Sequence, residues 1–540
     1  MTAFALTLDR VTYTLPDGRV LFSDLSAHFD STPTGLVGRN GVGKSVLGRL
    51  MAGQLAPTSG QLQRQGTVHL LAQHSGVLPG RIADLAGVAP VLDALDRIEA
   101  GSVDPDDFAR VGERWTLREQ LQAQWQRLGL PALDPAAPAA QLSGGQAMQV
   151  ALAGALLSDA DALVLDEPSN HLDSAHRQRL IDALAQWRGG LIVISHDRAL
   201  LRQMQRIVEL SPAGLRSYGG NHDLYAAQRQ EEQAAAEAQL ALRKRERRQE
   251  QNALREQRER QEHRQSRAQR DARTANQAPI LLGGMKNRAE GSAGRLQARH
   301  AERRAAADSR VRDAAQGIDH APQIAMLGPA LATPGPQQVA SLSGVVLPWV
   351  DACWRHIDLH LQRGDRIGVR GGNGSGKSTL LQVLAGTLEP LAGDVKRAAG
   401  AALLDQDLSS LPAQASALQL LQRANPQAGE ATLRTQLALL GLDAERSLRP
   451  LATLSGGERM KAALGAVLYA QNPPQLLLLD EPGNHLDLAS LAALEQMLNQ
   501  YRGSMVIVSH DQTLLDAVHL THYLDATATG WQRTPNANAQ

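Results

Sequence analysis

The chain has 540 residues, of which 20% are charged and 43% apolar, and its formal net charge is zero. This length allows two or three domains with ample cores, and no apolar run approaches the ~18 residues that a membrane-spanning helix needs. Its single cysteine, Cys353, excludes an internal disulfide, and the first residues lack the charged and apolar regions of an export signal, so we expect a cytoplasmic protein.

The first 221 residues are expected to form an α/β domain. Alternating apolar stretches such as FALTLDRVTY predict strands that lead into a glycine loop, GRNGVGKS at Gly38–Ser45, and an apolar-periodic helix follows the loop. A mostly helical region then reaches an LSGG segment at Leu142–Gly145. Two apolar runs follow, ALVLDEP and LIVISHD, and they predict buried strands of a parallel sheet with crossover helices.

A charged segment follows this domain. Between about His222 and Ser309 the composition changes to Glu, Arg, Gln and Ala, which together favour helix. We predict a helix of about 50 residues, roughly 75 Å long, then a hairpin tip at Ala278–Asn287 and a shorter return helix near Gly294–Arg310. The segment Arg229–Arg310 holds 20 Lys or Arg and 12 Asp or Glu, so the neutral chain contains one basic element.

The second half of the chain repeats the motifs of the first in the same order. Its glycine loop reads GGNGSGKS at Gly371–Ser378. In both halves, a glutamine lies 29 positions after the loop lysine, and the SHD histidine lies 29 positions after the DEP glutamate. The first half carries 21 additional residues between the glutamine and LSGG. We therefore expect a duplicated module, with α/β domains at residues 1–221 and 319–540 and a helical linker at residues 222–318.

The glycine loops have the composition of phosphate-binding loops. Glycine lets backbone N–H groups approach phosphate oxygens at the start of a helix, because no Cβ atoms block them. We predict that Lys44 and Lys377 neutralise the β- and γ-phosphates and that Ser45 and Ser378 place hydroxyls on Mg²⁺. The other predicted nucleotide-binding residues of these loops are Gly38, Asn40, Gly41, Gly43, Gly371, Asn373, Gly374, Gly376 and Thr379.

The DEP and SHD triplets supply groups suited to hydrolysis. Asp166 and Asp480 end apolar strands and are predicted to hold Mg²⁺, often through water. Glu167 and Glu481 would then lie beside the γ-phosphate, where a carboxylate can polarise the attacking water. Two further pairs are candidates: Gln73 and Gln406 to sense and bind Mg²⁺ and water, and His196 and His510 to hydrogen-bond the γ-phosphate.

Taken together, these motifs resemble the ATP-binding cassette superfamily. The resemblance lies in LSGGQ at Leu142–Gln146, LSGGE at Leu454–Glu458 and the DEPxNHLD strings at Asp166–Asp173 and Asp480–Asp487. It implies two P-loop NTPase cassettes, joined here by a long helical hairpin, that bind ATP and Mg²⁺ head to tail within a monomer. Site one would join Lys44 and Glu167 to Ser455, Gly456 and Gly457, and site two would join Lys377 and Glu481 to Ser143, Gly144 and Gly145.

A few positions differ from the family pattern or differ between the two halves of the chain. Val46 stands where the second half has Thr379, and Gly483 stands where the first half has Ser169. Both halves have Leu-Pro near the place where cassette proteins often stack an aromatic side chain on adenine. Tyr13 and Trp349 are the nearby aromatic residues, and each is either such a stacking residue or part of a core.

The string YGGNHDLY at Tyr218–Tyr225, ahead of the charged linker, resembles the F subfamily over essentially the whole chain. Members lack membrane domains and act on ribosomes, with the linker directed toward the peptidyl-transferase region, and some protect ribosomes from antibiotics. The resemblance implies a ribosome partner, with rRNA and tRNA contacted by the basic linker. At the hairpin tip, Leu281, Leu282, Met285 and Lys286 would tune activity.

Other functions remain to be weighed against this one. The chain could be the cytosolic ATPase subunit of a membrane importer. Alternatively, its linker could be a solvated spacer between the two halves. Neither function requires an excess of Lys and Arg in the linker. A chromosome or repair ATPase would need zinc-binding cysteines or far longer coiled coils, and the sequence has one cysteine and a short hairpin.

Overall fold

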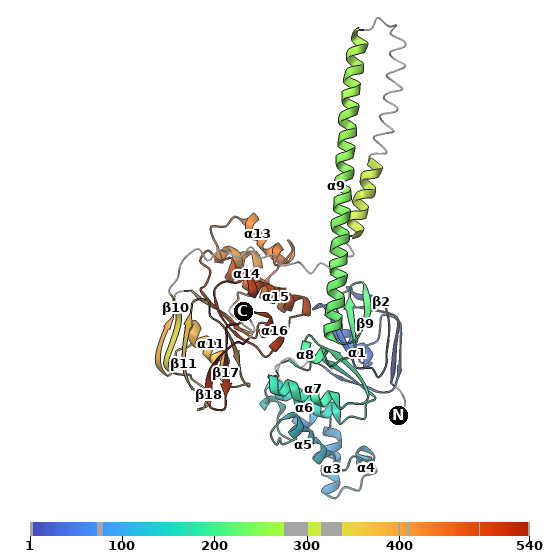
Figure 1. Ribbon diagram of the computed structural model, residues 1–540. Coiled ribbons are helices and arrows are strands. Elements are labelled where there is room, and N and C mark those ends of the chain that lie inside the picture. Colours follow the sequence, from blue (N-terminus) through green and yellow to red (C-terminus); the bar gives the residue numbers. More distant parts are fainter. Residues whose placement is uncertain are drawn as a thin grey trace. The chain divides into compact units, whose positions relative to one another are not determined.

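The computed structural model describes residues 4–72, 79–170, 172–274, 301–314, 337–397, 400–406, 408, 411–484 and 486–537. The chain divides into two compact units, of which one comprises Met1–His222 with Pro322–Gln540 and the other comprises Asp223–Ala321 (Figure 1). The first unit contains two cassettes, which we call cassette 1 and cassette 2 in chain order. The second unit is the linker.

Cassette 1 has a main sheet and a small antiparallel sheet. Within the described residues, the main sheet has the order β5-β6-β7-β3-β8-β9 and is parallel except for β9, and the small sheet has the order β2-β1-β4. The strands are β1 (Ala5–Thr14), β2 (Val20–Phe29), β3 (Thr34–Gly38), β4 (Ser59–Gln65), β5 (Val68–Leu71), β6 (Ala162–Asp166), β7 (Gly190–Ile194), β8 (Arg206–Ser211) and β9 (Gly214–Gly219). The helices are α1 (Lys44–Met51), α2 (Ile82–Leu85), α3 (Ala89–Glu99), α4 (Pro105–Val111), α5 (Leu117–Leu128), α6 (Gly144–Leu156), α7 (Ser174–Ala185) and α8 (Arg198–Leu201).

Cassette 2 repeats this topology. Its main sheet has the order β14-β15-β16-β12-β17-β18 and its small sheet the order β11-β10-β13, again counted over the described part of the chain. The strands are β10 (Gln338–Val346), β11 (His356–Gln362), β12 (Arg366–Arg370), β13 (Ala392–Arg397), β14 (Ala401–Leu404), β15 (Leu476–Asp480), β16 (Ser504–Val508), β17 (His522–Thr527) and β18 (Gly530–Pro535). The helices are α11 (Lys377–Ala385), α12 (Ala417–Ala424), α13 (Glu430–Leu439), α14 (Gly456–Leu468), α15 (Leu488–Gln500) and α16 (Gln512–Ala517).

The central strands are mostly apolar because both faces of the main sheet are covered. Every residue of β6 and β7 is buried, as expected for strands in the middle of a parallel sheet. In cassette 1, Leu36 of β3, Leu47 of α1 and Leu6 of β1 belong to one core, so the helix after the phosphate loop lies between the main and small sheets. The predicted α/β class and the duplicated P-loop architecture are confirmed.

The register of the parallel strands brings the site motifs together. Asp166 at the end of β6 is opposite Ile194 at the end of β7, and Asp480 is opposite Val508 in cassette 2. The carboxyl ends of neighbouring parallel strands meet at one edge of the sheet, where ligands of such folds bind. The DEP and SHD triplets therefore follow adjacent strands at the same edge.

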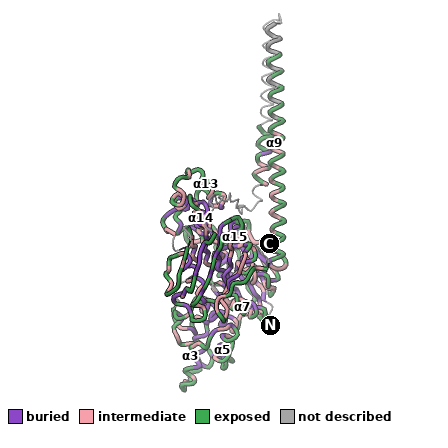
Figure 2. The backbone as a smooth tube through the Cα atoms, turned by 60° about the vertical axis from the view of Figure 1, so that its left-hand side comes forward, coloured by how far each residue is buried: buried purple, intermediate pink, exposed green. Residues whose placement is uncertain are grey.

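The linker unit contains the predicted long helix. Helix α9 runs over His222–Thr274, 53 residues, and a second described helix covers residues 301–314. Arg247 pairs with Asp308, and Arg310 pairs with Glu250, so the two helices lie side by side as limbs of a hairpin. Figure 2 shows that α9 is mostly exposed, as its scarcity of large apolar side chains predicts. The predicted tip residues lie outside the described residues.

Candidate active sites

The two phosphate loops share one backbone design. Gly43 and Gly376 precede α1 and α11 with φ of +106° and +89°, in the left-handed region that favours glycine. Lys44 Nζ donates hydrogen bonds to the carbonyls of Gly38 at 2.7 Å and Arg39 at 3.2 Å. In cassette 2, the ammonium group does the same within its own loop, at 2.9 Å and 2.8 Å. Each lysine is thus held at the start of a helix, where anions bind.

Electrostatics around these lysines favour a bound anion and a cation. Burial lowers the pKa of Lys377, and the nearby carboxylates, Glu481 foremost, partly oppose the shift. Burial raises the pKa of Asp166 and of Asp480, while hydrogen bonds with Ser45 and Ser378, respectively, lower it. A serine hydroxyl and an aspartate oxygen therefore meet in each cassette. Such hard oxygen donors, completed by phosphate oxygens, fit Mg²⁺.

The glutamates after these aspartates are held in an unusual backbone conformation. Glu167 and Glu481 have φ of +51° and +48°, which is rare for a residue other than glycine. Their N–H groups donate to the carbonyls of Ile194 at 2.8 Å and Val508 at 2.9 Å, on the neighbouring strand. Strained residues of this kind persist where the surrounding structure fixes them, often at functional sites.

Both glutamates are largely buried beside a histidine. Burial raises the pKa of Glu481 to about 7 and raises that of Glu167 as well. His510 Nε2 lies 3.6 Å from Glu481 Oε1, and His196 Nε2 lies 3.7 Å from Glu167 Oε1. Burial lowers the pKa of His510 to about 4, so its ring is neutral at pH 7 and serves as a hydrogen-bonding group.

The LSGG serines begin helices in both cassettes. Ser143 and Ser455 are the N-caps of α6 and α14, and the Oγ atom of each accepts a hydrogen bond from the backbone N–H three residues later, at 3.3 Å. The side chains of Gln146 and Glu458 bond back to the cap N–H groups and complete a capping box. Each LSGG segment therefore presents a serine and a helix N-terminus, a combination that attracts negative charge.

A cavity of about 700 Å³ brings the predicted site two together. Its lining comes from both cassettes. From cassette 1 it includes Ser143, Gly144 and Gly145, together with Glu167 and His196 of the predicted site one. From cassette 2 it includes Asn373, Gly374, Gly376, Lys377, Ser378, Thr379, Gln406, Asp480, Glu481 and His510. Trp349, 85% exposed, also lines this cavity. Gly371 begins the same loop.

At the predicted site one, cassette 2 approaches the phosphate loop of cassette 1. Asp487 Oδ2 accepts the backbone N–H of Asn40 at 2.9 Å, and the charge of Asp487 acts on Lys44. Burial lowers the pKa of Lys461 in α14, and the nearby positive charge of Arg39 in the phosphate loop lowers this pKa further. Helix α14 has Ser455 as its N-cap and Gly456 and Gly457 in its first turn, and the loop of cassette 1 contains Gly38, Gly41, Gly43 and Ser45. Gln73 lies outside the described residues.

The last aspartate of each DEPxNHLD string joins the cassettes, a role that the sequence analysis did not assign. Asp173 Oδ1 caps its own helix α7 at the N–H of His176, 2.9 Å, while Oδ2 accepts the N–H of Asn373 at 3.2 Å. Asp487 likewise caps α15 at Ser490, 2.8 Å, and binds the loop of cassette 1. The spacing of the string carries this signal, because it places an aspartate suited to an N-cap seven positions after the aspartate that ends the strand.

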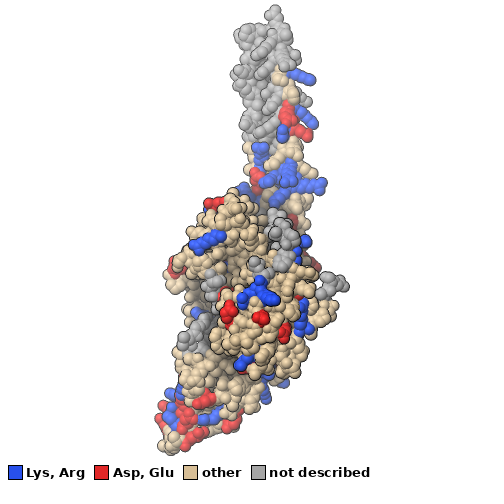
Figure 3. Space-filling view, turned by 90° about the vertical axis from the view of Figure 1, so that its left-hand side faces the viewer, with Lys and Arg blue, Asp and Glu red and all other residues tan. Residues whose placement is uncertain are grey.

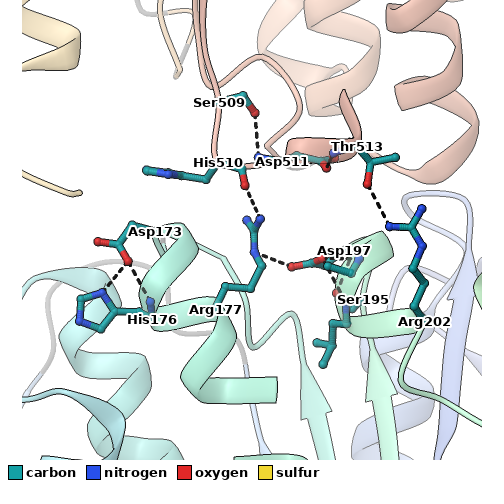
Figure 4. A network of polar contacts seen from close by, with 12 residues as sticks. Asp173, His176, Arg177, Ser195, Asp197, Arg202, Ser509, His510, Asp511 and Thr513 are labelled. Carbon is teal, nitrogen blue, oxygen red and sulfur yellow. Dashed lines mark hydrogen bonds and ion pairs between the residues drawn. The ribbon is translucent and has the colours of Figure 1, made fainter. Parts of the chain in front are cut away.

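Arginines of cassette 1 add further contacts that the sequence analysis missed. Arg177 Nη1 donates to the carbonyl of His510 at 2.5 Å, and Arg202 Nη1 donates to Thr513 Oγ1 at 3.2 Å (Figure 4). Arg198 pairs with Glu495 at 2.6 Å. From the sequence alone, an arginine that contacts another domain cannot be distinguished from one that points into solvent.

Comparison with known proteins places these features in a family. A family model described as "ABC transporter" matches residues 27–170 and 354–484. The tylosin resistance ATP-binding protein TlrC of Streptomyces fradiae is 32% identical over 536 residues, which cover 92% of this chain and 93% of TlrC. The probable ATP-binding protein YheS of Haemophilus influenzae is 30% identical over 501 residues, covering 89% of this chain and 73% of YheS.

Solved structures show the same fold. The archaeal ribosome recycling factor aABCE1, in complex with the stalk protein aP1, superimposes with a TM-score of 0.59 at 17% identity, covering 98% of this chain and 91% of that chain. Every helix in the described part of this chain is too short or too polar to cross a lipid bilayer. With two matched cassettes, the paired phosphate loops and relatives of this length, the chain belongs to the F subfamily of the ATP-binding cassette family, and it is an ATP-hydrolysing enzyme.

Proposed function

We propose that the protein hydrolyses ATP at two sites between its cassettes and uses the resulting change in cassette pairing to act on the ribosome, which its basic linker contacts. The observation that supports action on the ribosome is the charge of the linker. In the segment Arg229–Arg310, 20 cationic residues outnumber 12 anionic ones, and the rest of the chain has the opposite net charge, so the whole chain is neutral. Phosphate contacts supply most of the non-specific affinity of proteins for RNA. In Figure 3, Lys and Arg side chains gather on the described part of the linker.

In each site, the roles follow from the geometry of the residues. The loop lysine, Lys44 or Lys377, would leave its loop carbonyls to bind phosphate oxygens, since a triphosphate is the stronger partner for an ammonium group. The serine and helix N-terminus of the opposite LSGG segment would bind the γ-phosphate from the other side. ATP then joins the cassettes, and loss of the γ-phosphate removes that contact.

The hydrolytic step needs a positioned base. Glu481, held by its backbone and largely buried, would orient and polarise the attacking water, and neutral His510 would hydrogen-bond the γ-phosphate. Glu167 and His196 would do the same in site one. Ser45, Asp166, Ser378 and Asp480 would hold Mg²⁺, and Gln406 lies in the site two lining where it could bind the metal or the water. Bound Mg²⁺ would neutralise charge that develops on the phosphate oxygens.

One relative suggests which of two outcomes to test first. TlrC is named for resistance to tylosin. A protective role would therefore appear as increased tylosin tolerance when the chain is expressed in a sensitive host, with the Glu167→Gln/Glu481→Gln variant giving none. A general translation role would instead change protein synthesis without changing tolerance.

The test uses that same double variant, which should bind ATP and remain closed. We expect it to co-sediment with ribosomes in a sucrose gradient in the presence of ATP, and to stay at the top of the gradient with ADP. Purified wild-type protein is the control, because it should cycle and sediment less. If the variant stays at the top with ATP while membrane importer subunits pull it down, the importer interpretation is correct.

A further inference from the structure

The contacts between the cassettes are reciprocal at one place and one-sided at another. The reciprocal contacts are those of Asp173 and Asp487, each with the opposite phosphate loop. Among the described residues, the one-sided contacts come from Arg177, Arg198 and Arg202, all in cassette 1. The side chains that stand at the equivalent positions of cassette 2 are Leu491, Gln512 and Asp516 when the DEPxNHLD strings are superimposed.

Arg177 also forms an ion pair within its own cassette. Its Nε atom lies 2.8 Å from Asp197 Oδ2, and the two side chains are only 16% and 10% exposed. Asp197 is itself fixed, because its Oδ1 atom caps α8 at the N–H groups of Ala199 and Leu200. The guanidinium therefore has a set direction when it reaches across to cassette 2 (Figure 4).

The group that Arg177 meets belongs to the predicted hydrolytic residues of site two. Its Nη1 atom donates to the carbonyl oxygen of His510 at 2.5 Å. The N–H of the same residue donates to Glu481 Oε2 at 3.3 Å, and its ring Nε2 lies 3.2 Å from Asn373 Oδ1. A charge-assisted hydrogen bond on this carbonyl orients the histidine that holds both other contacts.

At the corresponding position of site one, the described part of cassette 2 offers a leucine in place of this arginine. Leu491 replaces the arginine, is 3% exposed, and cannot donate a hydrogen bond to the carbonyl of His196. Its Cδ1 atom would lie 3.2 Å from a Cβ atom on Gly483, so the glycine that replaces Ser169 makes room for the leucine. In the described part of the chain, neither ring nitrogen of His196 has a hydrogen-bond partner.

We infer that Arg177 is a positioning residue for site two that acts across the cassette boundary. His510 reaches its working orientation only when cassette 1 is engaged, so hydrolysis at site two depends on this arginine and hydrolysis at site one does not. The two sites are therefore unequal in how their chemistry is coupled to cassette pairing. The inference rests on the hydrolytic roles proposed above for the glutamates.

The experiment isolates each site in the full-length protein. Glu167→Gln leaves site two active, and Glu481→Gln leaves site one active. We expect Arg177→Leu to lower kcat about tenfold in the Glu167→Gln background, with KM for ATP unchanged, because one hydrogen bond to a charged group is lost. In the Glu481→Gln background, the same substitution should change kcat by less than about twofold.

Two further variants control for a merely structural effect. Arg177→Lys keeps a charged donor and should restore part of kcat, whereas Arg179→Leu, which changes an exposed arginine on the same helix, should change neither site. Equal losses in both backgrounds, no loss in either, or a raised KM with unchanged kcat would each overturn the inference. If neither single glutamine variant lowers ATP hydrolysis, the proposed catalytic glutamates are themselves wrong, and the inference fails with them.

Discussion

Trp349 combines two properties that rarely occur together in a large aromatic residue. It is 85% exposed, and its φ of +56° lies in the left-handed region. It also lines the cavity of site two, whereas Tyr13 packs against Phe22 with ring centroids 6.3 Å apart. Of the two aromatic residues considered for adenine stacking, Trp349 is thus free to meet a flat ligand at the cavity.

We therefore expect Trp349→Ala to weaken ATP binding at site two. Stacking of a base on an aromatic side chain contributes about 1–3 kcal/mol, so the Kd should rise at least about fivefold. Titration calorimetry on the Glu481→Gln protein measures this constant. Trp115→Ala removes an indole that is 49% exposed between α4 and α5 and should leave it unchanged. An unchanged Kd in the Trp349 variant would exclude stacking.

Gly376 shows how the phosphate loop depends on one missing side chain. A Cβ atom here would lie 2.7 Å from Cγ2 of Val350, which is itself buried, and φ is +89°. We expect Gly376→Ala to lower the free energy of unfolding by about 2 kcal/mol, from backbone strain and the clash together. Urea unfolding measures the loss. Gly429→Ala, at φ −64° in open space, should cost only a few tenths of a kcal/mol.

The motif residues could be predicted from the sequence because glycine, lysine and carboxylate requirements of phosphate binding are local. Arg177 could not, because its contact joins residues 333 positions apart and depends on the pairing of two domains. The same holds for Asp173, whose spacing was visible but whose partner was not. Comparing the two halves reveals Arg177 only after the structure shows what it touches.

At the scale of elements, strand prediction succeeded where the pattern was strongest. The apolar runs before DEP and SHD form β6, β7, β15 and β16, since a covered parallel strand needs apolar side chains on both faces. The pairing order of the small sheets was not predictable, because antiparallel partners such as β1 and β4 are separated by the phosphate loop and α1. Long-range pairing leaves little trace in local sequence.

Helices α8 and α15 are joined by a partly buried ion pair. Arg198 and Glu495 are 11% and 16% exposed, with Nη1 and Oε1 2.6 Å apart. A double-mutant cycle with Arg198→Met and Glu495→Gln should give a coupling energy of about 1–3 kcal/mol on ATP-dependent cassette closure. Fluorescence energy transfer between dyes on the two cassettes, followed against ATP concentration, measures closure.

The matched control is an exposed pair within one helix. Arg434 and Glu430 of α13 are 39% and 54% exposed and 2.7 Å apart. The corresponding cycle, Arg434→Met with Glu430→Gln, should show no coupling in closure. A similar coupling for both pairs would mean that the readout reports general stability and not contact between α8 and α15.

At the scale of the whole molecule, charge is concentrated in the linker. Lys244, Arg245 and Arg248 of α9 are exposed and carry no ion pair in the described part of the chain. We expect their joint replacement by glutamine to weaken ribosome binding and to reduce the slope of log K against log salt by about two, since each lost phosphate contact removes roughly 0.7–0.9.

Filter binding over a range of KCl concentrations gives this slope. The control replaces three exposed arginines of the cassettes, Arg127, Arg188 and Arg502, by glutamine, which removes the same charge from other surfaces. Equal slopes for the two triple variants would show that net charge, and not the linker, determines binding. The linker would then be a spacer.

The aspartates Asp173 and Asp487 each divide their two oxygens between different tasks, one on their own helix and one on the opposite loop. A cassette that lost its hydrolytic activity by mutation would still need this aspartate to cap its own helix and to bind the opposite cassette. Loss of hydrolysis at one site therefore need not weaken the pairing of the cassettes. A related chain could lose activity in one cassette and keep both cassettes joined.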